Sequence, residues 1–158
     1  MKNQYTFDEW AMMELFKSII KEGFDNDPMQ EKDFWYKVFG ERDIKFYESY
    51  QIDKPQFPCI VISFISVPTT RNIHSSEIEQ FSTVTALIDT FNQGVGDYGK
   101  EQLGIMINTQ LKRILQSSFG LIINNNRTIS NIDDSVYRRR IEAGFVYDNK
   151  NQIFYQGE

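Results

Sequence analysis

The chain has 158 residues and a net charge of −5, and 15% of its residues are aromatic. This length is typical of one domain with its own core, so we expect a single domain over residues 1–158. The acidic balance argues against a general duplex-DNA binder, which is usually basic. The single cysteine, Cys59, excludes an internal disulfide and a cysteine-based zinc site.

The N-terminal residues and the apolar runs of the sequence indicate in which cellular compartment to expect the protein. No apolar segment follows Lys2, and no run approaches the ~18 apolar residues that span a bilayer. We therefore expect neither a signal peptide nor a membrane contact. Cys59 lies in the apolar run Pro58–Ile62, where we expect it to be buried, and a reducing cytoplasm suits it.

The first half of the chain predicts one helix followed by strands. Thr6-Phe7-Asp8-Glu9 matches a capping box, and Gly23 is a typical helix stop, so we predict a helix from about residue 7 to 22. Apolar residues recur in it at helical spacing as Met12, Phe16, Ile19 and Ile20. Residues 24–43 are ambiguous between helix and strand. Residues 44–50 and 59–67 predict strands, the second of them central in a sheet.

The second half begins with a polar loop over residues 69–76. Residues 79–91 favour a strand, with a helix as the alternative, and a glycine-rich break follows at residues 92–99. An apolar stripe then predicts a helix from Lys100 to about Ser117, formed by Leu103, Ile107, Leu111, Ile114 and Leu115. We predict a short strand at residues 119–123, a turn at Asn124–Asn126 and a closing hairpin from about Tyr137.

The order helix, strands, helix, strands predicts the fold class. Sheet pairs joined by short turns favour antiparallel neighbours, and the helices then lie on one face of the sheet. We therefore expect an α+β domain, with a mostly antiparallel sheet and two main helices packed on one face.

Catalytic patterns are weak in this sequence. Gly94-Val95-Gly96-Asp97-Tyr98-Gly99 matches the glycine pattern of dinucleotide-binding loops, but residues 111–123 lack the acidic residue that such a site needs about 20 positions on. We interpret the segment as a loop with a helix N-cap at Asp97. The only histidine, His74, has no surrounding pattern typical of a catalytic triad.

Metal chemistry has only one set of candidates. Asp89, Asp97 and Glu101 could bind the metal ion of a metal-dependent nuclease. The only support for this alternative is that all three side chains are carboxylates. We expect no catalytic residue, cofactor or metal. A small cytoplasmic metal-dependent enzyme or nucleotide-binding protein stays open as an alternative, as does an adaptor that binds a host protein through its aromatic residues.

Three adjacent arginines lie on the predicted strand of the closing hairpin. Strand alternation places Arg138 and Arg140 on one face and Arg139 on the other. Either acidic neighbours in the same subunit balance them, namely Glu142, Asp133 and Asp134, or they contact another subunit or a nucleic acid passing through a ring. We expect the hairpin to form a sheet edge between subunits. The candidate interface residues are Arg138, Arg139, Arg140, Tyr147, Phe154 and Tyr155.

The C-terminal third carries a resemblance to a known family. Its segments are Lys100–Asn108, Phe119–Ile123, Val136–Arg139, Ile141–Tyr147 and Ile153–Tyr155. In this order they resemble the bacteriophage tail terminator family, also called tail completion or head–tail joining proteins. The predicted N-terminal helix and the predicted sheet strand at Pro58–Ile62 also fit the order of elements in this family.

The resemblance implies a structural protein of the virion and not an enzyme. It implies a homo-hexameric ring that caps the tail tube, joins it to the neck and head, and is assembled in the cytoplasm of the host bacterium. The implied partners are the tail tube protein and a neck or head-completion protein, with DNA passing through the ring without sequence-specific binding. Another neck or head-completion protein of the same virion is the nearest alternative.

Overall fold

The computed structural model describes residues 7–25, 44–47, 56–68, 81–129, 134–151 and 153–156, without the side chains of 67, 68 and 153–156. Two helices and six strands lie within these residues. In chain order they are α1 (Glu9–Asp25), β1 (Lys45–Tyr47), β2 (Cys59–Pro68), β3 (Phe81–Asn92), α3 (Lys100–Ser118), β4 (Ile122–Ile129), β5 (Tyr137–Asp148) and β6 (Ile153–Gln156).

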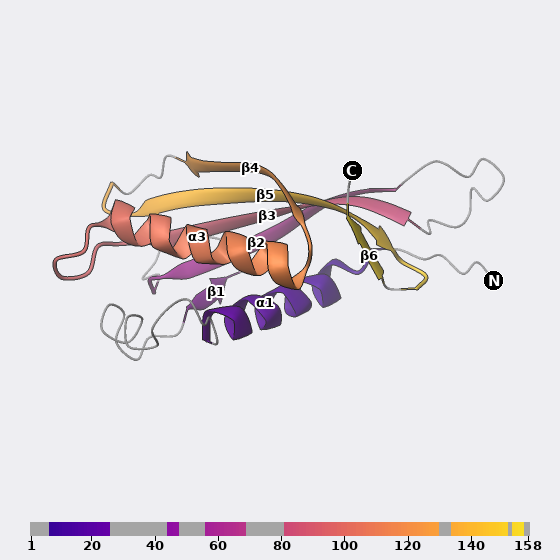
Figure 1. Cartoon of the computed structure of the whole chain (residues 1–158), viewed down its shortest axis with the longest axis horizontal. Helices are drawn as coiled ribbons and strands as arrows, with labels where there is room; N and C mark the ends of the chain where they lie inside the picture. The colour runs from indigo at the N-terminus through magenta and orange to yellow at the C-terminus, as the bar shows by residue number, and fades with distance from the viewer. Residues whose placement is uncertain are drawn as a thin grey trace.

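The strands form one sheet in the order β1-β2-β3-β5-β4, and β6 also pairs with β5 (Figure 1). Strand β1 runs parallel to β2, and the other described pairs are antiparallel. Strand β4 pairs with residues 138–144 of β5, and β6 pairs with residues 145–148. This arrangement confirms the predicted α+β fold with a mostly antiparallel sheet.

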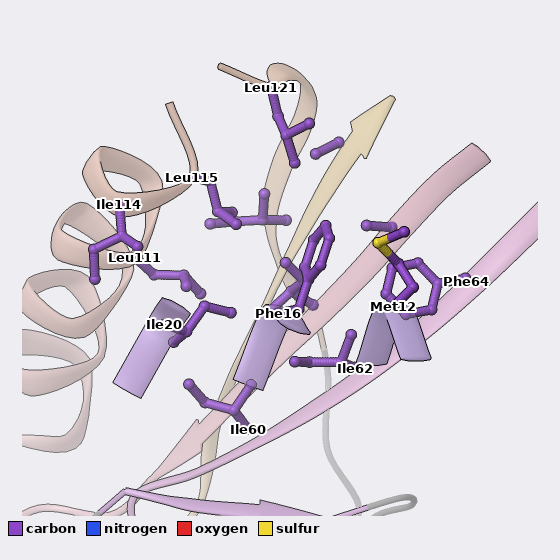
Figure 2. Close-up of a cluster of buried hydrophobic side chains, with 14 of the residues drawn as sticks. Met12, Phe16, Ile20, Ile60, Ile62, Phe64, Leu111, Ile114, Leu115 and Leu121 are labelled. Atoms are coloured by element: carbon purple, nitrogen blue, oxygen red, sulfur yellow. The ribbon is translucent and has the colours of Figure 1, made fainter. Parts of the chain in front are cut away.

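Both helices pack on the same face of the sheet. Side chains of α1, β2 and α3 converge in one buried cluster (Figure 2). Its labelled members are Met12, Phe16, Ile20, Ile60, Ile62, Phe64, Leu111, Ile114, Leu115 and Leu121. Phe16 lies at the centre: its ring stacks on Phe119 with centroids 4.2 Å apart and meets Phe64 edge-on at 5.1 Å. Burial of this apolar area is the main favourable contribution to folding.

Helix α1 begins and ends at different residues from those predicted. Asp8 is the N-cap, because its Oδ1 accepts a hydrogen bond from the amide of Ala11 at 3.0 Å. The Thr6 of the predicted capping box lies outside the described residues. The predicted stop at Gly23 is wrong, because α1 continues to Asp25.

The two helix-interior glycines mark close approaches between elements. A Cβ on Gly23 would lie 2.6 Å from Cγ1 of Ile114, where α1 meets α3. A Cβ on Gly104 would overlap the ring of Tyr137 and lie 2.8 Å from Oδ1 of Asn92, where α3 crosses the sheet. The close packing that each glycine permits thus outweighs its unfavourable helix propensity, which is about 1 kcal/mol relative to alanine.

Strand β4 replaces a predicted turn. The structure has no turn at Asn124–Asn126: these residues lie inside β4, which begins at Ile122 and contains a bulge between Ile123 and Asn125. The predicted strand at residues 119–123 is wrong for residues 119–121, because Phe119 caps α3 and β4 begins only at Ile122. Pairing with β5 overrides the turn preference of asparagine, because strand formation depends on neighbouring strands more than on intrinsic preference.

Several other predictions are settled within the described residues. Residues 81–92 form a strand and not a helix, and the helix predicted from Lys100 is confirmed. Strand β2 is interior as expected, between β1 and β3. The ambiguous segment 26–43, the end of the strand predicted at 44–50, and the polar loop with His74 lie outside the described residues. No helix in the described part of the chain is long and apolar enough to cross a membrane.

Candidate functional site

A cluster of ion pairs in the sheet joins Asp89 of β3 to two arginines of β5, Arg138 and Arg140. Asp89 pairs with Arg140 in the strand register, and Arg138 lies two residues away on the same face. Arg140 donates from Nε to Oδ1 at 2.7 Å and from Nη2 to Oδ2 at 3.0 Å. Arg138 donates from Nη2 to the same Oδ2 at 2.5 Å. One carboxylate therefore holds two guanidinium groups.

The cluster is largely desolvated. The side chain of Asp89 is 7% exposed, and those of Arg138 and Arg140 are 24% exposed. The guanidinium carbon of Arg138 also lies 5.2 Å from the ring centre of Phe91, a cation–π contact. The hydrogen bond to Asp89 raises the pKa of Arg140 above its ordinary value, against the opposing effect of burial, and the charges of Asp89 and Glu142 add to the rise. Arg140 therefore stays cationic.

The cluster lies on the sheet face opposite the helices. We call the middle of this face the bare face, because no described helix lies on it. It consists of Ser63, Ile65, Thr85, Leu87, Ile122, Arg127, Arg140 and Glu142. At one end a small cluster of Cys59, Phe91 and Val136 is covered by Tyr47 and Phe57 instead.

A third arginine extends the cluster toward the sheet edge. Arg127 of β4 pairs with Arg140 in the register, so two like charges face each other. Arg127 Nη2 lies 3.6 Å from Oε1 of Glu142, and its side chain is 54% exposed. Three arginines thus share two carboxylates, Asp89 and Glu142, and the patch is basic in an acidic chain.

Arg139 lies on the helix-covered face, which confirms the alternation predicted from the sequence. Its Nε donates to Oδ1 of Asn126 at 2.9 Å, and its Nη1 donates to the hydroxyl of Tyr137 at 3.3 Å. Asn126 in turn donates from Nδ2 to Oδ1 of Asn108 on α3 at 2.9 Å. Arg139 is therefore part of a polar link between the sheet and α3.

The expectation that the hairpin forms a sheet edge is wrong for β5. Every residue from Tyr137 to Asp148 pairs with β3, and β4 and β6 pair along the other side. Arg138 and Arg140 therefore have a partner within the chain, Asp89, which the sequence interpretation did not consider for them. Their contact with another subunit stays a prediction.

The aromatic candidates lie on and beside β5. Tyr147 is half-buried, and its ring meets that of Phe7 edge-on at 5.8 Å. Burial raises the pKa of Tyr147, and the charges of Asp8 and Asp148 raise it further. Phe154 and Tyr155 pair through their backbones with Tyr147 and Val146, and their side chains lie outside the described residues.

The three candidate metal ligands lie in different elements and have different surroundings. Asp89 is engaged by arginines, Asp97 lies in the tight turn closed by the Val95–Tyr98 bridge, and Glu101 is exposed in the first turn of α3. No group of three or more His, Cys, Asp or Glu in the described ranges could hold a metal ion. The N-cap of α3 is Gly99 and not Asp97 as predicted.

One signal in the sequence could have identified Asp89 as the arginine partner. It is the only charged residue in the twelve of β3, and the ten of β2 contain none. A lone carboxylate in two interior strands needs a counter-charge, because burial of an unpaired charge is costly. The arginine run on the next paired strand supplies it.

Comparison of the chain with protein-family models and with curated proteins finds no match.

Proposed function

We propose that the chain is a structural protein of a phage virion, a tail terminator that forms a hexameric ring, caps the tail tube and joins it to the neck and head. The observation that carries the proposal is the bare face. Among the described residues no helix covers this side of the central strands, and the face combines exposed apolar residues, Ile65 and Ile122, with Arg127. Such mixed surfaces are typical of protein contacts.

The order of the elements supports the same proposal. Helix α1, strand β2, helix α3 and the β5–β6 hairpin follow one another as the resemblance to tail terminators implies. In this proposal the ring binds the tail tube protein on one side and a neck or head-completion protein on the other, inside the host bacterial cytoplasm during assembly.

The charges of the chain support passage of DNA without sequence-specific binding. The net charge is −5, and the arginine pair Arg138 and Arg140 is already bound to Asp89. An acidic subunit whose Arg138 and Arg140 are bound to Asp89 has little attraction for the phosphate backbone, which usually dominates DNA affinity. DNA would then move through the ring without being held.

Deletion of the coding sequence from the phage genome tests the proposal. We expect particles with tails of wrong length, or with tails unattached to heads, and restoration by the wild-type chain supplied in trans. Electron microscopy of the purified protein should show a six-fold ring with a pore wide enough for duplex DNA. Intact virions after deletion would refute the proposal.

The same experiment separates the nearest alternative. Tails of wrong length indicate a terminator, because the ring ends growth of the tube. Tails of normal length that stay unattached indicate a neck or head-completion protein of the same virion instead.

A further inference from the structure

The outer face of α1 combines exposed apolar and acidic side chains. Trp10 is 61% exposed and Leu15 is 40% exposed. Helical spacing places Trp10 and Leu15 on the two flanks of the side that faces away from Phe16 and Ile20. Between these flanks lie the exposed Glu14, Lys21, Glu22 and Asp25. Lys17 lies 3.5 Å from Glu14 and 5.9 Å from the ring centre of Trp10. The helix holds four carboxylates against two lysines. On the outer face, Glu14, Glu22 and Asp25 exceed Lys17 and Lys21 by one negative charge, and the unpaired excess lies at Glu22 and Asp25 near the helix C-terminus.

The C-terminal end of α1 has an unfavourable charge pattern. Its last turn contains no basic residue, although Glu22 and Asp25 are exposed there. The C-terminus of a helix carries partial negative charge, so carboxylates near it are disfavoured and cations are favoured. A basic surface brought against this end would relieve the repulsion.

The bare face has the complementary properties. Ile65 is 55% exposed and Ile122 is 43% exposed, on strands at either side of the central pair β3 and β5. In the register, Thr85 and Gly144 lie between Ile65 and Ile122. Further along the strands on the same face, Arg127, Arg138 and Arg140 exceed Asp89 and Glu142 by one positive charge. The face thus offers apolar contacts and an excess of cations to an acidic, apolar partner.

We propose that the bare face of one subunit docks the outer face of α1 of a second copy of this chain. Trp10 and Leu15 would cover the apolar residues around Ile65 and Ile122, and the carboxylates of α1 would meet Arg127 and its neighbours. This contact rests on the proposed ring function and deepens it, because it names the two surfaces that join adjacent subunits.

The dimensions and the placement of the two surfaces fit such a contact. A helix of 17 residues is about 26 Å long, and strands of 12 residues such as β3 and β5 are about 40 Å long. The helices and the bare face lie on opposite sides of the sheet (Figure 1). Contact between two different surfaces is head-to-tail, and such contacts form a ring when the rotation between subunits closes.

Two variants test the contact from its two sides. The sheet variant carries Ile65→Asp and Arg127→Glu, and the helix variant carries Trp10→Glu and Leu15→Glu, so that the two altered surfaces are both acidic and repel each other. All four positions are exposed, so circular dichroism and thermal unfolding should match the wild type. If Ile65→Asp prevents folding, Arg127→Glu alone serves as the sheet variant. A matched control carries Ile105→Asp and Lys112→Glu on the exposed side of α3, outside the proposed contact.

Native mass spectrometry and light scattering measure the result. We expect the wild type and the α3 control to form the same oligomer, and each test variant alone to lose every species above the monomer. An equimolar mixture of the two variants should form a one-to-one dimer and stop there. The sheet variant keeps an intact outer face of α1, and the helix variant keeps an intact bare face. These two intact surfaces can meet in the mixture, but neither molecule has a second native surface with which to extend the chain of contacts.

Three outcomes overturn the contact: either variant keeps the wild-type oligomer, the mixture stays monomeric, or the wild type itself is monomeric. An oligomeric ring that survives both variants would leave the proposed function standing and show that subunits meet elsewhere. The deletion phenotype tests the proposed function without reference to this contact, so the two failures are distinguishable.

Discussion

Asp89 on β3 and Arg140 on β5 face each other across paired strands, with Arg140 Nε 2.7 Å from Asp89 Oδ1. The same carboxylate also binds Arg138, so two of the three adjacent arginines depend on one acidic residue. This relationship assigns the arginine pair a role in folding. It leaves the more exposed Arg127 as the better probe of contacts with another subunit.

Replacement Asp89→Asn should destabilise the isolated subunit by about 2–4 kcal/mol, because it leaves two partly buried guanidinium groups without a counter-charge. For a chain of this length we expect the midpoint of thermal unfolding to fall by roughly 5–15 °C. Glu142→Gln is the matched control, because its pair with Arg127 spans 3.6 Å at the surface and contributes about 0–1 kcal/mol. Equal losses in both variants would contradict the assigned role of Asp89.

Replacement Gly104→Ala should destabilise the protein by about 1–3 kcal/mol, although alanine favours helices. The added methyl group would overlap the ring of Tyr137, whose hydroxyl is within 3.0 Å of Thr128 Oγ1. Chemical denaturation measures the loss. The double variant Gly104→Ala/Tyr137→Leu should lose less than the two single variants together, since the smaller side chain makes room. A Gly104→Ala variant more stable than the wild type would refute the close approach of α3 to β5.

Replacement Gly99→Ser should stabilise the protein by about 0.5–1 kcal/mol. Gly99 is the N-cap of α3, has φ −71° and ψ 154°, and provides no side-chain capping bond. No heavy atom lies within 4 Å of an added Cβ. Serine can accept a bond from the first turn and restricts the unfolded chain. Thermal unfolding should show a rise of about 2–4 °C, and Gly99→Ala, which cannot cap, should fall short of it.

Stability should decline at alkaline pH because of Cys59. Burial raises the pKa of this thiol from its ordinary value of 9.0 to about 12. Between these values the unfolded chain releases a proton that the folded chain keeps, so the free energy of unfolding falls as pH rises. The slope from this group approaches about 1.4 kcal/mol per pH unit, and below pH 9 its contribution is constant.

Denaturant titrations of the wild type and of Cys59→Ala across this pH range measure that slope. We expect the wild type to lose more stability than the variant as pH rises, which separates the thiol from other alkaline groups such as Tyr147. The buried thiol should also react with a thiol reagent only after unfolding. Parallel pH profiles, or rapid labelling of the folded protein, would show that Cys59 is accessible.

Local patterns in the sequence determined most of the elements. The apolar spacing from Lys100 predicted α3, because a helix buries residues that recur every three or four positions. The β-branched run after Pro58 predicted β2, and the alternation at Arg138, Arg139 and Arg140 placed them correctly on two faces. Each of these signals depends only on residues near one another in the chain.

Tertiary structure alone decided the features that depend on distant residues. Gly23 continues a helix because Ile114 of α3 packs against it, and Asn124–Asn126 extend a strand because β5 offers backbone partners. The pairing of Asp89 with Arg140 joins residues 51 positions apart and follows from the register of β3 with β5. Local preferences of residues other than proline amount to at most about 1 kcal/mol per residue, so packing and pairing between elements outweigh them at Gly23 and at Asn124–Asn126.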